Sequence, residues 1–337
     1  MDTLFSLPIL SLVLIPTMSS YATSLNFIFF YVTWSTLVLS HSPLRVELVG
    51  SAAVRLTFFL LPSVIFFLFD VLTPSAAVII KAHGQAGLPA GRAFGMVRAR
   101  DLKVACWAIF NVVLATVLQG AIETLLVQVL QVRSAVKVSM KLPMPWQMGQ
   151  GLVLGLLIRE GLTYYIHRYG LHNPRSVFTR YLSRCHQAWY HSLRTPFPLT
   201  AHYDHPLVYI FIRFIPTYLP ALLLRFHMLT YIFYLTFVSI EETFAYCGYT
   251  VMPTNFFMGG IARRTDEHLI GEGTGNFGPW GILDWAFGSS TTSSAGAGED
   301  PMADLDEQEI EKRVRETMEA SKRKIREGTL RRNTRPT

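Results

Sequence analysis

Charged residues are scarce in this chain of 337 residues. Asp, Glu, Lys and Arg together make up 16% of it, whereas hydrophobic residues make up 50%. This composition excludes an ordinary soluble domain, in which about a quarter of the residues are charged. A helix needs roughly 20 apolar residues to cross a bilayer, and several such runs predict a multi-pass membrane protein. The expected spans are residues 21–39, 55–72, 104–130, 146–166, 207–224 and 228–244.

Cysteine is also rare, and several catalytic motifs are missing. Cys106, Cys185 and Cys247 lie far apart and form no CxxC pair, so neither a zinc ribbon nor a disulfide framework is expected. The sequence has no HExxH motif and no Ser nucleophile elbow, which argues against a zincin protease and a lipase. GEGTGNFG, residues 271–278, lacks the GxGxxG frame of a dinucleotide site. Any redox reaction would therefore need an external electron donor.

Basic residues outnumber acidic ones, and the formal net charge is +7. They gather in residues 81–103 and again in residues 312–335. By the positive-inside rule, both stretches should face the cytosol. No nucleic-acid recognition motif accompanies them, so we expect binding to anionic headgroups and no nucleic-acid partner.

The composition changes at SSTTSSAGAG, residues 289–298, which is typical of a flexible linker. Three parts are therefore expected along the chain. An N-terminal transmembrane region with a basic loop covers residues 1–103, and a membrane domain covers 104–288. The linker and a charged cytosolic tail make up residues 289–337.

Histidines are concentrated in one short stretch. Six of the ten lie between His167 and His205, after one predicted span and before a hairpin of two more. Neutral imidazole is a good ligand for iron, zinc or copper. One histidine at a membrane edge is most often only an interfacial polar residue, but six together favour a metal site. The candidates are His167 and His172 in HRYGLH, His186 and His191 in HQAWYH, His202 and His205 in HYDHP, and the distant His268.

Two acidic residues, Glu241 and Glu242, end an otherwise apolar run. Carboxylates in such a place are costly unless they are paired or metal-bound. We therefore expect at least one of them to be functional, and both are candidate catalytic residues.

The order and spacing of these motifs resemble the fatty acid hydroxylase and sterol desaturase superfamily of membrane di-iron enzymes. The resemblance covers roughly residues 146–288. It depends on the histidine boxes HRYGLH and HQAWYH, on RTPFPLTAHYDHP, on EETFAYCGY after the hairpin, and on the ending NFGPWGILDWAFG.

The resemblance implies an all-α integral membrane bundle with a metal site on the cytosolic face of the endoplasmic reticulum. It implies O2-dependent hydroxylation or desaturation of a fatty acyl chain or sterol in lipid biosynthesis, in which residues 104–288 form the catalytic domain. Cytochrome b5 or a similar protein would supply the electrons. Two iron ions would be bound by the histidines of the boxes, here His167, His172, His186, His191, His202, His205 and His268.

Some positions depart from the family pattern. Tyr190 and Tyr246 stand where the family usually has histidine, and the last box keeps only His268. A second hypothesis is therefore a non-catalytic descendant that keeps the fold and binds lipid or a partner membrane protein. Metal content separates the two hypotheses, because an enzyme of this family should hold about two iron ions per chain and the descendant should hold none.

Overall fold

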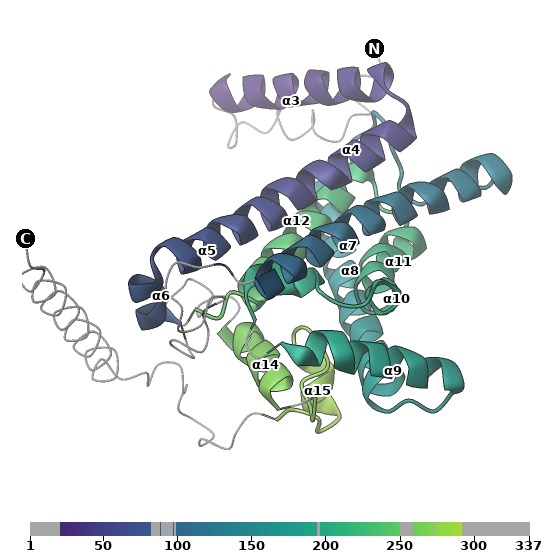
Figure 1. The fold of residues 1–337 in the computed structure, drawn as a ribbon. Helices are drawn as coiled ribbons and strands as arrows, with labels where there is room; N and C mark the ends of the chain where they lie inside the picture. The colour runs from purple at the N-terminus through teal and green to yellow at the C-terminus, as the bar shows by residue number, and fades with distance from the viewer. Residues whose placement is uncertain are drawn as a thin grey trace, which may run out of the picture.

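The computed structural model describes residues 21–81, 99–193, 196–249, 259–271 and 273–291, together with Leu88 and Val97 (Figure 1). Within these residues the chain is helical, and the only β pairing consists of two isolated bridges. The predicted all-α membrane bundle is confirmed. The expectations for the basic loop around Arg98 and for the cytosolic tail fall outside the described residues.

The described chain is a succession of helices of different lengths. The long ones are α3 (Tyr21–Ser40), α4 (Pro43–Arg55), α5 (Leu61–Leu72), α7 (Ala99–Thr124), α8 (Pro145–Tyr165), α9 (Val177–Trp189), α11 (Ile215–Leu224), α12 (Met228–Ala245) and α14 (Gly259–Ile270). Shorter helices are α6 (Pro74–Ile80), α10 (Pro206–Tyr209) and α15 (Ile282–Ala286). Four π-helical stretches interrupt or extend them, at Leu56–Leu60, Leu125–Val129, Ile166–His172 and Ile210–Phe214. Two 3-10 turns cover Tyr190–Ser192 and Pro198–His202.

Three helical stretches of the described chain are long and apolar enough to cross a membrane. They are Pro43–Leu72, Ala99–Val129 and Pro206–Leu224, and a shorter apolar helix covers Leu25–Ser40. The spans predicted at 146–166 and 228–244 form the helices α8 and α12. Each of these two helices carries two charged residues, Arg159 and Glu160 on α8 and Glu241 and Glu242 on α12.

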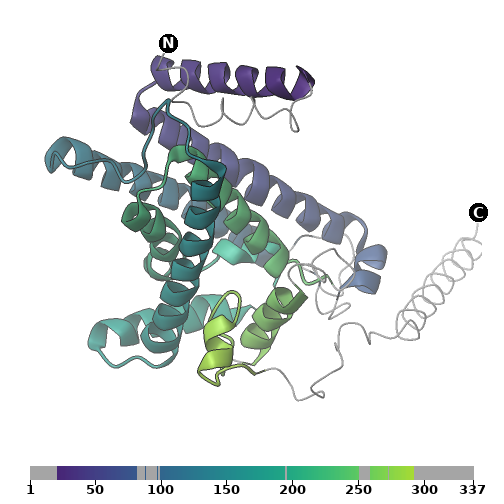
Figure 2. The same cartoon turned by 180° about the vertical axis from the view of Figure 1, so that it is seen from behind.

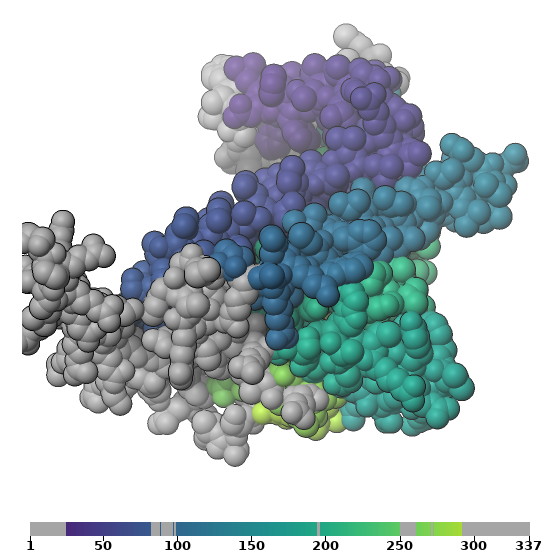
Figure 3. All heavy atoms as spheres, viewed as in Figure 1, coloured from purple at the N-terminus to yellow at the C-terminus, as the bar shows by residue number. Residues whose placement is uncertain are grey.

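The outer faces of the first helices are apolar. On α5 and α7, for example, Leu61, Val113 and Val117 are each more than half exposed. In the space-filling view these helices form much of the visible surface (Figure 3). Large exposed apolar areas mark contact with a membrane or a partner, so this surface fits a lipid environment.

The first long span begins with sequence signals that a helix needs. Ser42 caps α4 by accepting a hydrogen bond from the Arg45 N–H at 3.4 Å, and Pro43 occupies the first helical position. The main core lies where α4, α8, α11 and α12 meet, around Met228, Tyr234 and Val238. Helices α9, α14 and α15 gather at the end of the molecule away from α3, as both ribbon views show (Figures 1 and 2). That end carries the histidines.

Candidate metal centre

The first two histidines lie on a π-helical turn at the end of α8. On an α-helix positions five residues apart diverge, so the sequence indicated that His167 and His172 need an unwound last turn to meet. In the structure this turn is not unwound. Ile166–His172 is a π-helix, whose hydrogen bonds join residues five positions apart, so His167 and His172 lie on the same face. The ring centroids of the two histidines are 4.9 Å apart. Asn173 and Pro174 then end the helix.

Helix α9 returns the chain and brings the second pair of histidines. Ser176 caps it by accepting from the Thr179 N–H at 3.1 Å. His186 lies in its last turn, and His191 follows on the 3-10 turn, with the two ring centroids 4.9 Å apart. From far along the sequence, α14 adds His268, whose ring centroid is 4.5 Å from that of His167.

These residues form the five-histidine cluster, defined as His167, His172, His186, His191 and His268. Ligand nitrogens of four of them, all except His191, lie within 4.8 Å of one another. The Nε2 atom of every member is buried and has no hydrogen-bond partner among the described residues. A buried polar atom without a partner costs free energy. Four of them gathered within 4.8 Å of one another, with a fifth on a neighbouring ring, therefore fit a bound metal ion.

The opposite ring nitrogens explain why Nε2 is available. The Nδ1–H of His167 donates to the Phe277 carbonyl at 2.9 Å, and that of His268 donates to the Gly275 carbonyl at 2.6 Å. The Nδ1 atom of His186 is 2.6 Å from Asp204 Oδ2. Carbonyl and carboxylate oxygens can only accept, so the proton lies on Nδ1 and the lone pair on Nε2. Histidines that bind metals are oriented in this way.

Three members of the cluster are held in their neutral form. Burial, reinforced by the neighbouring histidines, lowers the pKa of His167 well below its usual value and lowers that of His191 to about 3. Burial also lowers the pKa of His268 to about 4. Near neutral pH these imidazoles are therefore unprotonated, which is the form that binds a metal.

The structure does not bring His202 and His205 into the cluster. His202 is buried, and both of its nitrogens have partners, Nδ1 with the Tyr209 hydroxyl at 2.8 Å and Nε2 with Glu242 Oε2 at 3.0 Å. His205 is half-buried and caps α10, where its Nδ1 accepts from the Leu207 N–H at 3.3 Å. The dipeptide His205-Pro206 is a sequence signal for such a helix start. Five of the seven predicted ligands thus lie together, and two lie apart.

The two predicted catalytic carboxylates are ion-paired. Glu241 accepts two bonds from Arg159, at 2.8 and 3.0 Å, and Glu242 lies 2.5 Å from Arg55 and 3.6 Å from Arg159. The arginines come from α8 and α4. These arginines offset the free-energy cost of burying the two carboxylates of α12. The sequence indicated that the carboxylates need partners but did not identify the arginines.

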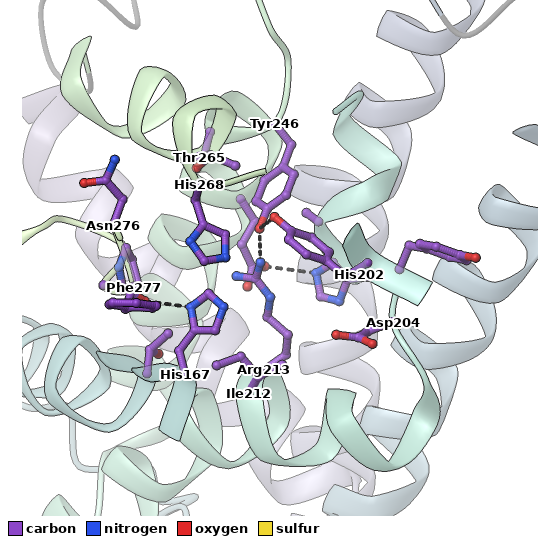
Figure 4. Close-up of a pocket in the computed structure, with 18 of the residues that line it drawn as sticks. His167, His202, Asp204, Ile212, Arg213, Tyr246, Thr265, His268, Asn276 and Phe277 are labelled. Carbon is purple, nitrogen blue, oxygen red and sulfur yellow. Dashed lines mark hydrogen bonds and ion pairs between the residues drawn. The ribbon is translucent and has the colours of Figure 1, made fainter. Parts of the chain in front are cut away.

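A cavity of about 60 Å³ separates the cluster from these carboxylates. The cluster members His167, His186 and His268 line it, and so do His202, Glu241 and Glu242. In Figure 4, Arg213 lies between His167 and His268 on one side and His202 on the other, with Tyr246 above it. Arg213 was not among the functional residues predicted from the sequence. It is a single charged residue within an apolar span, and such a residue usually has a functional role.

Gly273 controls the position of His172, and replacing it tests the site. A methyl group on Gly273 would overlap the His172 ring, and the backbone there has φ = +79°, which disfavours any side chain. We expect Gly273→Ala to displace His172 and to lower metal content at least about tenfold, as loss of a group that orients ligands commonly does. Gly288→Ala is the control, since φ is +63° there and nothing lies within 4 Å of the added methyl. Equal metal content in the two purified variants would contradict this role for Gly273.

Comparisons with known proteins agree with this architecture. Residues 152–289 match the family model of the fatty acid hydroxylases. Methylsterol monooxygenase 2-1 of Arabidopsis thaliana is 29% identical over 166 residues, which cover 44% of this chain and 58% of that protein. No solved structure matches the chain.

The helical membrane bundle with its buried histidine cluster and these matches define the class of protein. Residues 152–289 belong to the fatty acid hydroxylase family by this match. The predicted resemblance is confirmed, and the comparisons support a lipid oxidase at the level of the family. The matched region is less than two thirds of the Arabidopsis protein, so that protein's reaction is not transferred to this chain by the match alone.

Proposed function

We propose that the chain is a membrane-bound iron enzyme that hydroxylates or desaturates a lipid, such as a fatty acyl chain or a sterol, with O2 and external electrons. The observation that carries this proposal is the five-histidine cluster, in which neutral imidazoles direct unpartnered Nε2 atoms at one buried place. Imidazole suits iron, zinc and copper alike, and the match of residues 152–289 to this family favours iron.

Iron in this family supplies the activation of dioxygen, and the resemblance predicts two iron ions. Within the described residues, unpartnered imidazole nitrogens converge only at the cluster. We therefore propose its five members as the iron ligands.

The chain's own residues orient the ligands and keep water away. The carbonyls of Gly275 and Phe277 and the carboxylate of Asp204 fix three imidazole rings, and Asp204 is itself held by the His205 N–H, 2.7 Å from its Oδ1. The rings of Phe277 and Tyr190 pack against the cluster. Rigidly held ligands in a site that excludes water favour reaction with a C–H bond over reaction with water.

We propose that Glu241 and Glu242 act in the wall of the cavity, which both of them line. Glu242 is hydrogen-bonded to His202, and Glu241 accepts from the Trp280 indole N–H at 2.8 Å. Glu242 thus holds His202, which lines the cavity, and Glu241 holds Trp280, which follows the lining residue Pro279. Their proposed contribution is to fix the shape and charge of the wall.

A lipid substrate would enter from the membrane, because the helices around the site are apolar on their outer faces. The Arabidopsis relative is named for a methylsterol, so sterols are the first substrates to test. We propose the endoplasmic reticulum as the location, with the site facing the cytosol and cytochrome b5 or a similar protein as electron donor. The described residues contain no nucleotide-binding motif that would replace such a donor.

Lipid analysis tests the proposal. Cells that express the chain should contain a lipid with one added oxygen atom or with two hydrogen atoms fewer, and cells with the His186→Ala variant at equal abundance should lack it. Mass spectrometry of total sterols and acyl chains provides the measurement. Identical lipids in both cells, together with metal-free purified protein, would favour the non-catalytic descendant.

A further inference from the structure

A positive charge lies in the cavity beside the five-histidine cluster. Arg213 extends from the π-helix Ile210–Phe214, and its guanidinium carbon is 5.3 Å from the centre of the Tyr246 ring. It also donates a hydrogen bond to the Tyr246 hydroxyl. In Figure 4 it separates His167 and His268 from His202. Any second ion placed between the two sides of the cavity would therefore lie beside this guanidinium.

Arginine opposes a second metal ion in two ways. It has no lone pair to offer as a ligand, and it keeps its charge at all accessible pH values. A divalent cation in the same cavity would be repelled, and the repulsion is stronger in a buried site of low dielectric constant than it would be in water. Glu241 and Glu242 do not cancel this charge, because they are paired with Arg159 and Arg55. Glu242 also attracts Arg213, so these two carboxylates face three guanidinium groups.

Two tyrosines occupy the remaining space where histidines would be expected. The hydroxyl of Tyr190 donates to that of Tyr246 at 3.1 Å, so the Tyr246 oxygen accepts from both Tyr190 and Arg213. The Tyr190 ring stacks on the ring of His186, with centroids 5.1 Å apart. Tyr190, Tyr246 and Arg213 therefore form a hydrogen-bonded group that fills the place beside the cluster.

The two other predicted ligands, His202 and His205, make contacts with other residues. His202 would have to break its bonds with Tyr209 and Glu242 to bind a metal. The half-buried ring of His205 packs on Trp189, with ring centroids 5.4 Å apart, and its Nδ1 accepts from the Leu207 N–H. Among the described residues, no second group of unpartnered imidazoles faces the cavity.

We infer that this centre holds one metal ion, bound by the five-histidine cluster, and that Arg213 with Tyr190 and Tyr246 takes the place of a second ion. This inference rests on the proposed metal dependence. It differs from the two-iron centre that the family resemblance implies.

Counting metal ions tests the inference. The full chain, purified in detergent without oxygen, is loaded with Fe(II), dialysed, and analysed for iron and protein by mass spectrometry. We expect one ion per chain, and two would overturn the inference while leaving the enzyme proposal intact. No bound ion would instead overturn the proposed metal dependence. A titration of the wild-type chain with Co(II), followed by absorption, gives the same count without any variant.

Matched histidine variants identify the ligands. His186→Ala should lower the affinity for Co(II) at least about tenfold, whereas His202→Ala should leave both the affinity and the count unchanged. Loss of an ion in His202→Ala would show that this residue is a ligand and would overturn the inference. If His202→Ala fails to fold, the Co(II) titration of the wild-type chain tests the inference instead. An end point at two ions per chain in that titration contradicts the inference by itself.

Discussion

Replacing His167 by alanine should reduce product formation below detection while the protein stays inserted in the membrane. His167 is nearest to His268 in the cluster and is held by the Phe277 carbonyl, so its removal opens the ligand set and frees that carbonyl. The residue lies at the end of α8, beyond the main core, and the bundle should persist. Lipid products and membrane extraction are measured side by side.

His205→Ala provides the comparison for this experiment. The sequence predicts His205 as a ligand, but the structure places it on the cap of α10, outside the cluster. We expect it to keep a substantial part of the activity. A loss as complete as that of His167→Ala would show that His205 reaches the centre in the working enzyme.

Arg159→Met should destabilise the protein strongly. It removes the partner of Glu241 and one of the two arginines near Glu242, in a region where all three side chains are almost fully buried. Removing one member of a buried ion pair costs about 3–5 kcal/mol, because the remaining charge stays buried without compensation. The apparent melting temperature in detergent should fall by many degrees.

The pair Arg263–Glu267 supplies a matched control. Its atoms are also 2.8 Å apart, but it lies on one helix at positions i and i+4, and about a fifth of each side chain is exposed. Such pairs contribute about 0.3–0.5 kcal/mol, so Arg263→Met should shift the melting temperature little. Equal shifts in the two variants would mean that the Arg159 pair is not the stabilising contact we describe.

Local features of this protein could be predicted from its sequence, whereas its long-range pairings could not. The helix starts at Ser42 and Ser176 and the histidine boxes are local patterns, and the cluster contains both histidines of each of the first two boxes. The pairing of Arg55 with Glu242 joins residues 187 positions apart. No spacing rule connects such positions, because only packing of α4 against α12 brings them together.

The histidine boxes also show the limit of reading a motif by its resemblance. His202 and His205 occur in a motif of the right kind, but whether an imidazole points at a metal depends on which neighbours its nitrogens meet. For His202 these are Tyr209 and Glu242, and for His167 one is a carbonyl that leaves Nε2 available. The π-helix that aligns His167 with His172 is likewise a backbone adjustment that residue propensities do not reveal.

The origin of the five ligands has a consequence for the lifetime of the protein in the cell. Four of the ligands come from one continuous stretch, His167 to His191, and the fifth comes from α14, which follows much later in the chain. A bound ion would thus fasten α14 to the rest of the bundle, and its binding free energy would add to the folding free energy. Cells short of iron would then hold a looser protein, more open to quality-control proteases, so that iron supply would set the abundance of the protein as well as its activity.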